Sequence, residues 1–217
     1  MAIHKTIGKS FTAGKKTWIF GLVCLLLTEM GCAPAVVTPL PPTVRRIAVL
    51  PPYRLGTADI HSAATDVQAS GLPSRTIGDL LAQQARAQLA EKGLEVLDPI
   101  DVKVATRGRI PTSPQIAAQI MEEARLDATA LYIEVRRWEP TPDSRGMKAD
   151  GVIVALNVVM VDPKTGTILW QVQRPARPVT LYGVVLTGQA HLFVAETVMK
   201  EVFAHLGSRK PGTRANP

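Results

Sequence analysis

The stretch Arg45-Arg46-Ile47-Ala48-Val49-Leu50-Pro51-Pro52 decides the fold of this chain. Four consecutive apolar residues between a basic pair and two prolines predict a short central strand that is buried on both faces. Proline lacks the amide donor that a sheet ladder needs, so we expect the strand to end at Pro51. Such a strand is typical of a sheet that is covered by helices.

Two helices are expected after this strand, with a short strand between them. Ser74 is interpreted as the N-cap of the first helix and Gly93 as its end. Residues 94–97 predict the short strand. Ser113, followed by Pro114, is expected to cap the second helix. Apolar residues at helical spacing support both helices: Ile77, Leu80, Leu81, Ala85 and Leu89 in the first, and Ala117, Ile120, Met121 and Ala124 in the second.

Three strands and a final helix complete the expected order. Residues 128–138 alternate between two faces, whereas residues 151–161 are apolar at nearly every position except Asn157, so we expect both faces of that strand to be covered or to meet a partner. Residues 162–166 predict a hairpin turn that leads into a strand over residues 167–173. A last amphipathic helix is expected over residues 189–206.

The predicted fold class is therefore α/β, a single mixed sheet with helices packed against it in the order β-α-β-α-β-β-β-α. The predicted domain lies at residues 45–207. A proline-rich tether at residues 32–44 precedes it, and at about 3.1 Å per residue its extended part spans roughly 35 Å. Residues 208–217 are expected to form a disordered tail.

The first 31 residues have the features of a lipoprotein signal peptide. Four lysines precede an apolar run from Trp18 to Leu27, which is too short to span a bilayer. Gly31 directly precedes Cys32, the expected lipid acceptor and mature N-terminus. Cys24 lies inside the apolar run, so Cys32 is the only thiol of the predicted mature chain and no disulfide within it is expected.

Glu29 and Met30 depart from the usual lipoprotein signal, in which a leucine stands three residues before the cysteine and a small residue two before. Three interpretations stay open: lipidation at Cys32, cleavage or anchoring in some other way, and an incorrectly assigned start. Ala33, where an aspartate would favour retention at the inner membrane, favours sorting to the outer membrane.

The charge pattern gives no sign of nucleic-acid binding. The formal charge of +7 falls to about +4 once the leader is removed, and no basic and aromatic recognition pattern is present. The pairs Arg45-Arg46, Arg136-Arg137 and Arg174/Arg177 contribute much of it. They are interpreted either as solvated strand ends or as sites that attract anionic headgroups, lipopolysaccharide or peptidoglycan.

Two segments carry a family resemblance, together with the Arg-Ile-Ala-Val-Leu-Pro-Pro strand: Asp127-Ala128-Thr129-Ala130-Leu131-Tyr132-Ile133 and Val161-Asp162-Pro163-Lys164-Thr165-Gly166-Thr167-Ile168-Leu169-Trp170. They resemble a group of bacterial outer-membrane lipoproteins with TolB N-terminal-like, LpoB-like and CsgG-like folds, and a neisserial surface-lipoprotein antigen family of unassigned function. The resemblance spans roughly residues 45–175. It implies the fold and an envelope location, and it brings no catalytic residues.

No catalytic, cofactor-binding or metal-binding constellation is found, so the chain is not expected to be an enzyme or to need a cofactor. His61, His191 and His205 stand far apart in the sequence. Trp138, Trp170 and Tyr132 are the candidate contacts for a protein partner. Packing in the core or at its rim is the other interpretation of the two tryptophans.

The expected function is that of a non-catalytic interaction or assembly component of the cell envelope. The expected partners are the membrane, through lipid on Cys32, and an envelope protein or a second copy of the chain. The alternative is a lipoprotein that binds a small ligand or a glycan for a transport or secretion system. We expect an outer-membrane location, facing the periplasm or the cell surface.

Lipidation at Cys32 gives the first testable prediction. The chain should incorporate radiolabelled palmitate, its processing should be sensitive to globomycin, and Cys32→Ala should abolish the label because the acceptor thiol is gone. Mass spectrometry of protein from its native host would contradict this if it found Cys32 unmodified and the leader still attached.

Overall fold

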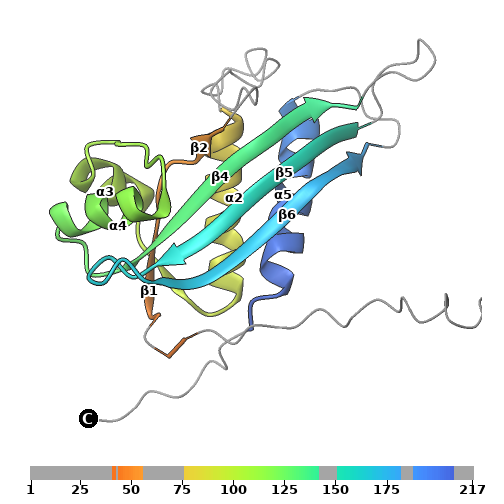
Figure 1. Cartoon of the computed structure of the whole chain (residues 1–217). Coiled ribbons are helices and arrows are strands. Elements are labelled where there is room, and N and C mark those ends of the chain that lie inside the picture. The colour runs from red at the N-terminus through yellow and green to blue at the C-terminus, as the bar shows by residue number, and fades with distance from the viewer. Residues whose placement is uncertain (1–40, 43, 56–75, 142–150, 182–187, 208–217) are drawn as a thin grey trace, which may run out of the picture. The chain divides into compact units, whose positions relative to one another are not determined.

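The computed structural model describes residues 41–42, 44–55, 76–141, 151–181 and 188–207, all in the unit that begins at Val36. The leader, Cys32, Ser74 and the tail at 208–217 lie outside the described residues. Within these ranges the chain forms six strands of one mixed sheet and four helices (Figure 1). These are β1 (Arg46–Val49), β2 (Tyr53–Arg54), α2 (Ile77–Glu91), β3 (Glu95–Val96), α3 (Pro99–Ala105), α4 (Pro114–Glu123), β4 (Thr129–Pro140), β5 (Gly151–Val161), β6 (Ile168–Thr180) and α5 (Gly188–Ala204).

The predicted α/β class is confirmed, and β1 is an interior strand as expected. It pairs in parallel with β3 on one side and with β4 on the other, in the sheet order β3-β1-β4-β5-β6. Ile47 and Val49 belong to one hydrophobic core, and Ala48 and Leu50 belong to a second core. Alternation along this one strand therefore contributes to both faces of the sheet.

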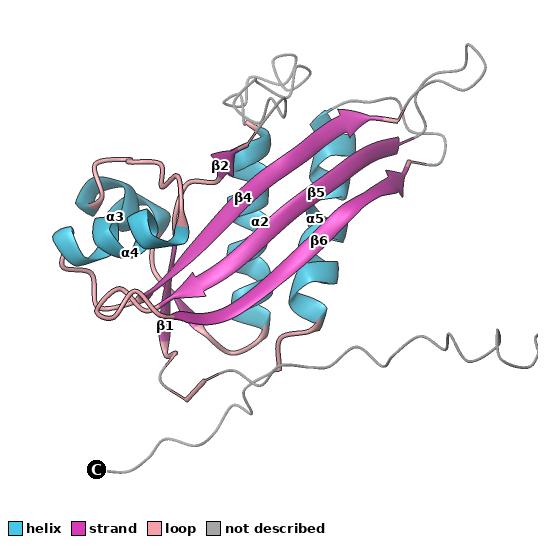
Figure 2. Cartoon of the chain, viewed as in Figure 1, coloured by secondary structure: helices cyan, strands magenta, loops and turns pink. Residues whose placement is uncertain are grey.

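Helices lie on both faces of the sheet (Figure 2). α2 and α5 contact each other and pack on one face, where their apolar residues meet those of β4 and β5. α3 and α4 cover part of the other face, where Val102 and Met121 pack against Tyr132 of β4 and Val159 of β5. The first core is the larger one. It includes the residues predicted to face inward from the last helix: Ala195, Val198, Met199, Val202, Phe203 and, partly buried, Leu192.

The N-terminus of α2 differs from the prediction. Its N-cap is Thr76, not Ser74: the Thr76 hydroxyl accepts a hydrogen bond from the Asp79 amide at 3.1 Å, and the Asp79 carboxylate accepts one from the Thr76 amide at 3.0 Å. This reciprocal pair is a capping box, which satisfies two amide donors of the first turn. At the other end, Gly93 follows the helix with φ +79°, as its predicted role requires.

Two short elements, α3 and β2, are not predicted by the sequence pattern. α3 begins at Pro99, after Asp98, whose carboxylate accepts a hydrogen bond from the Ile100 amide at 2.7 Å. β2 pairs in parallel with β4 through Tyr53 and Arg54. Both elements are too short to produce a periodic apolar pattern. Ser113 caps α4 with Pro114 in its first turn, as predicted.

β4, β5 and β6 form a long antiparallel meander, and β5 has the predicted bounds. β6 extends to Thr180, beyond the predicted end at Gln173, and includes Pro175 and Pro178. Proline is tolerated there because β6 is an edge strand of the described sheet.

The outer face of β5 is covered in the way its apolar sequence requires. Val159 and Val161 lie in the α3–α4 core, and Asn157, only 6% exposed, joins three strands through its side chain. Its amide donates to Glu134 of β4 at 3.3 Å and accepts from the Gln171 amide of β6 at 3.0 Å. Asn157, the one polar residue in the apolar run of β5, is thus the centre of a row of hydrogen-bonded side chains across three strands, which satisfies its buried amide.

Arg174 connects β6 to the rest of the domain. Its side chain is 5% exposed, and its Nε donates to Glu201 of α5 at 2.8 Å. Its Nη1 donates to the carbonyl oxygens of Val154 in β5 and Arg177 in β6. One guanidinium therefore holds a helix and two strands together with charge-assisted hydrogen bonds.

Arg174→Met is expected to lower the free energy of unfolding by about 1–3 kcal/mol, because the buried Val154 carbonyl and the partly buried Arg177 carbonyl lose this donor. Arg177→Met is the matched control: Arg177 approaches the same Glu201 at 4.0 Å but is 65% exposed, so the loss should stay below about 0.5 kcal/mol. Urea unfolding of both variants measures the difference. Equal losses would contradict the assigned role of Arg174.

Candidate functional site

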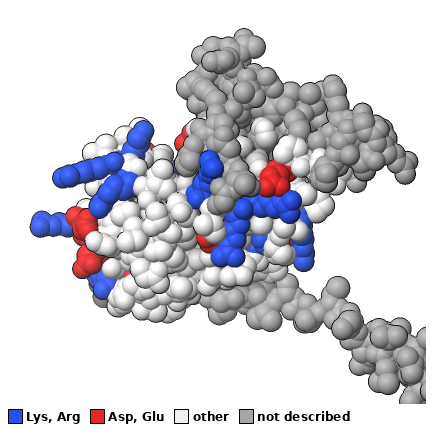
Figure 3. Space-filling model, turned by 45° about the horizontal axis from the view of Figure 1, so that its top comes forward, with Lys and Arg blue, Asp and Glu red and all other residues white. Residues whose placement is uncertain are grey.

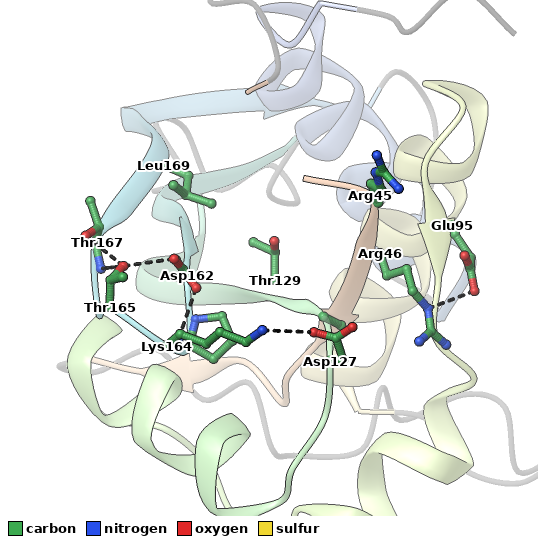
Figure 4. Close-up of a pocket in the computed structure, with 12 residues that line it drawn as sticks. Arg45, Arg46, Glu95, Asp127, Thr129, Asp162, Lys164, Thr165, Thr167 and Leu169 are labelled. Atoms are coloured by element: carbon green, nitrogen blue, oxygen red, sulfur yellow. Dashed lines mark hydrogen bonds and ion pairs between the residues drawn. The ribbon is translucent and has the colours of Figure 1, made fainter. Parts of the chain in front are cut away.

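A charged groove with a volume of about 710 Å³ lies at the end of the sheet where β1 begins (Figure 4). Its walls come from the start of β1, from β3, from the segment that enters β4, and from the turn between β5 and β6. The lining residues are Arg45, Arg46, Glu95, Asp127, Ala128, Thr129, Asp162, Pro163, Lys164, Thr165, Thr167 and Leu169.

The strand directions bring these segments together. β1 and β4 are parallel, so their first residues lie at the same end of the sheet. β5 is antiparallel to β4, so its last residue and the turn that follows come to that end too: Val161 pairs with Ala130 near the start of β4. Residues as distant in sequence as Arg45 and Lys164 therefore line one groove.

Two exposed ion pairs lie in the walls of the groove. Arg46 Nε lies 2.9 Å from Glu95 Oε1, and Lys164 Nζ lies 3.6 Å from Asp127 Oδ1, as Figure 4 shows. Exposed ion pairs contribute only about 0–1 kcal/mol each to stability. Their charges can therefore exchange partners at low cost when another charged surface approaches.

The turn that forms one wall is stabilised by Asp162. Its carboxylate accepts hydrogen bonds from the Lys164 amide at 3.0 Å and from the Thr165 hydroxyl at 2.9 Å. Gly166 has φ +68° and donates its amide to the Asp162 carbonyl, as the predicted hairpin requires. The turn presents Lys164 and Thr165, which are both exposed, to the groove.

The groove suits recognition of a polar, charged surface. It combines three basic side chains with three carboxylates, and no histidine, cysteine or serine is among its lining residues. Among the described residues, no group of three or more histidine, cysteine, aspartate or glutamate side chains could hold a metal ion. In the same ranges, no helix combines the length and the apolar character that crossing a bilayer needs.

Trp138, Trp170 and Tyr132, the predicted partner contacts, are all buried, with 6%, 3% and 1% of each residue exposed. Trp138 packs against His191 of α5, with ring centroids 6.1 Å apart. Trp170 stacks on Phe203 of α5 at 5.7 Å with the rings 10° from parallel. This burial supports the packing interpretation, and contact with a partner stays a prediction.

Tyr132 lies on the opposite face of the sheet from the two tryptophans. Its hydroxyl donates to the Thr112 carbonyl at 3.3 Å, in the core beneath α3 and α4. Burial, the largest cause, raises the pKa of Tyr132, and the nearby Glu134 raises it further. The phenol therefore stays protonated at neutral pH and acts as a hydrogen-bond donor.

The basic pairs identified in the sequence are largely compensated. Arg136 contacts Glu134 at 3.1 Å, Arg137 contacts Glu139 at 2.9 Å, and Arg174 contacts Glu201. Figure 3 accordingly shows several blue basic side chains beside red acidic ones. This pairing supports the interpretation that these arginines are solvated strand ends, in preference to the interpretation that they attract anions.

Sequence reasoning did not identify the groove. In the sequence, Asp127 and Lys164 indicate only a strand motif and a turn. The signal that could have revealed the groove is the strand order: once β5 is placed antiparallel to β4, the segment before β4 and the turn after β5 must meet at the same end. Lipidation at Cys32 concerns a residue outside the described ranges and stays a prediction.

No protein-family model matches this sequence, and no curated protein matches it. Among solved structures, the chain is similar to a PelC dodecamer from Paraburkholderia phytofirmans (14% identity, TM-score 0.48, 79% of this chain and 94% of that one). It is also similar to lipoprotein GNA1162 from Neisseria meningitidis (17% identity, TM-score 0.39, 72% of this chain and 95% of that one). A third similar structure is the LpoB C-terminal domain from Salmonella enterica (14% identity, TM-score 0.37, 74% of this chain and 93% of that one). At these scores the likenesses support no conclusion about the function of this chain.

Trp170→Ala should lower the free energy of unfolding by about 3–5 kcal/mol, because it removes a buried aromatic stack. Trp170→Phe should cost less. It keeps a ring against Phe203 and removes the buried indole nitrogen, which has no hydrogen-bond partner among the described residues. Chemical denaturation tests both variants. If Trp170→Ala unfolded like the wild type, Trp170 would not be a core residue.

Proposed function

We propose that this protein is a lipid-anchored component of the cell envelope that binds a protein partner through the charged groove and has no catalytic role. The position of the groove carries the proposal. Arg45 lines it, and the segment just before Arg45 is the predicted tether to Cys32. A partner bound in the groove would therefore be held close to the point where the chain connects to its membrane.

The length of the tether limits where such a partner can be. The extended part of the tether spans roughly 35 Å at about 3.1 Å per residue, so the groove would work within that distance of the lipid anchor. Two or three fatty chains on one cysteine would supply the attachment, since a single chain binds membranes only marginally. Ala33 after the cysteine favours the outer membrane in this proposal.

The ion pairs of the groove support a protein as its occupant. Arg46–Glu95 and Lys164–Asp127 alternate in sign along the groove, which matches a surface of mixed charge better than a purely anionic one. Small-ligand binding is the second candidate function. It is favoured by a separate, more apolar cavity at the opposite end of β1.

Site-specific photo-crosslinking in the native host tests the groove. A photoreactive residue at Thr165 should give one discrete crosslinked product, whereas the same residue at Ala87, exposed on α2, should not. Lys164→Glu should reduce the yield at least threefold, because it places a carboxylate beside Asp127. Its effect on stability should be small, since the pair is exposed.

Cys32→Ala should also reduce the crosslink by releasing the chain from the membrane. Identical products from Thr165 and Ala87, or a yield that Lys164→Glu leaves unchanged, would contradict the groove as the binding surface.

A further inference from the structure

A second cavity, of about 340 Å³, lies at the carboxyl end of β1, the opposite end of that strand from the groove. The end of β1, the first turns of α2, and α3 with the loop after it form its walls. The lining residues are Val49, Pro51, Pro52, Thr76, Gly78, Asp79, Ala82, Arg86, Pro99, Val102, Lys103, Gly108 and Ile110. Its volume is at the lower end of the range of about 300–1,000 Å³ that is usual for small-molecule sites.

The connections of the sheet explain why a cavity forms there. From β1 the chain passes through α2 to β3 on one side, and from β3 it passes through α3 and α4 to β4 on the other side. α2 packs on one face of the sheet, whereas α3 and α4 pack on the other. The two connections therefore leave the adjacent carboxyl ends of β1 and β3 toward opposite faces of the sheet. In open α/β sheets, ligands bind in the crevice at this kind of position.

Two basic side chains reach this cavity from opposite walls, Arg86 from α2 and Lys103 from α3. Neither one forms an ion pair within the described part of the chain. Arg86 is half-buried, and its burial, the largest cause, lowers its pKa, whereas Asp79 and Asp98 raise it. An arginine stays protonated in such surroundings, so the cavity contains a partly desolvated positive charge.

The two neighbouring carboxylates are already engaged elsewhere. Asp79 accepts hydrogen bonds from the amide and the hydroxyl of Thr76, and Asp98 accepts one from the Ile100 amide. They hold the first turns of α2 and α3 in place. Within the described residues the Arg86 guanidinium and the Lys103 ammonium have no hydrogen-bond acceptor, so their donors face the cavity, while Val49, Val102 and Ile110 supply an apolar wall.

We propose that this cavity binds a small ligand that carries one anionic group, a phosphate or a carboxylate, on an apolar body. The anionic group contacts Arg86 and Lys103. The apolar body packs against Val49 at the end of β1 and Val102 of α3. This inference rests on the second candidate function and is independent of the groove. Its test involves other residues, so the two proposals can fail separately.

Isothermal titration calorimetry on the full chain, purified in detergent, tests the site with three probes: phenyl phosphate, inorganic phosphate and phenol. Phenyl phosphate should bind with one site per chain and at least tenfold more tightly than either of the others, because only it combines the charge with an apolar ring. Arg86→Met and Lys103→Met should each weaken its binding at least tenfold.

Lys200→Met is the matched control. It removes a lysine of α5 that does not line the cavity, and the variant should bind phenyl phosphate like the wild type. Lys103 is exposed, so its variant keeps the test valid if Arg86→Met fails to fold.

The proposal would be overturned by absence of phenyl phosphate binding, or by binding that Lys103→Met leaves unchanged. It would also be overturned if inorganic phosphate or phenol bound as tightly as phenyl phosphate. Equally tight binding of inorganic phosphate would mean that the charge alone accounts for binding. Equally tight binding of phenol would mean that the apolar wall alone does so.

Discussion

The parallel pairing of β1 on both of its sides is the constraint on which the rest of this domain depends. Parallel neighbours cannot be joined by a tight turn, so each connection must cross over the sheet, and here each crossover contains a helix. Because the crossovers to β3 and β4 use opposite faces, β1 has to be apolar on both. Ile47 and Ala48, adjacent in sequence, accordingly belong to different cores. The groove and the cavity lie at the two ends of this one strand.

In the meander of β4, β5 and β6, polar side chains occupy part of the sheet face that the helices leave uncovered. β5 is apolar enough to need cover along its length, and α4 covers only the part near Val159 and Val161. Beyond that part, Asn157 of β5 lies between Glu134 of β4 and Gln171 of β6 and is hydrogen-bonded to both. Side chains of adjacent strands thus take the place of a third helix layer, and both the amide nitrogen and the amide oxygen of Asn157 have a hydrogen-bond partner.

Much of the fold was predictable because its signals are local. The bounds of β5, the cap at Ser113 and the stop at Gly93 each follow from a few neighbouring residues whose backbone preference is strong. The cap at Thr76 is harder to predict, because Ser74 and Thr76 are both residue types that cap helices. Only Asp79, three residues after Thr76, distinguishes the two positions. α3 and β2 were missed because a pattern cannot be recognised over so few residues.

The candidate sites were much less predictable, since both assemble from segments that are distant in sequence. Arg86 looks like an ordinary polar position on α2 until the crossovers place it opposite Lys103. Conversely, Trp138 and Trp170 stand out in composition, yet α5 buries both of them. In this domain the rare tryptophans pack in the core, whereas charged residues of common types line both cavities.

The two prolines of β6 also matter for a chain of this design. Under the proposed lipid anchor, copies on one membrane would meet at high local concentration, and an unpaired strand edge would then recruit further strands from neighbouring copies. Pro175 and Pro178 each remove an amide donor from the edge strand, and the opposite edge, β3, is only two residues long. Both edges of the described sheet are therefore poor templates for strand pairing between copies. An assembly of copies under this proposal would use side-chain contacts, which depend on sequence, in place of backbone pairing between sheet edges.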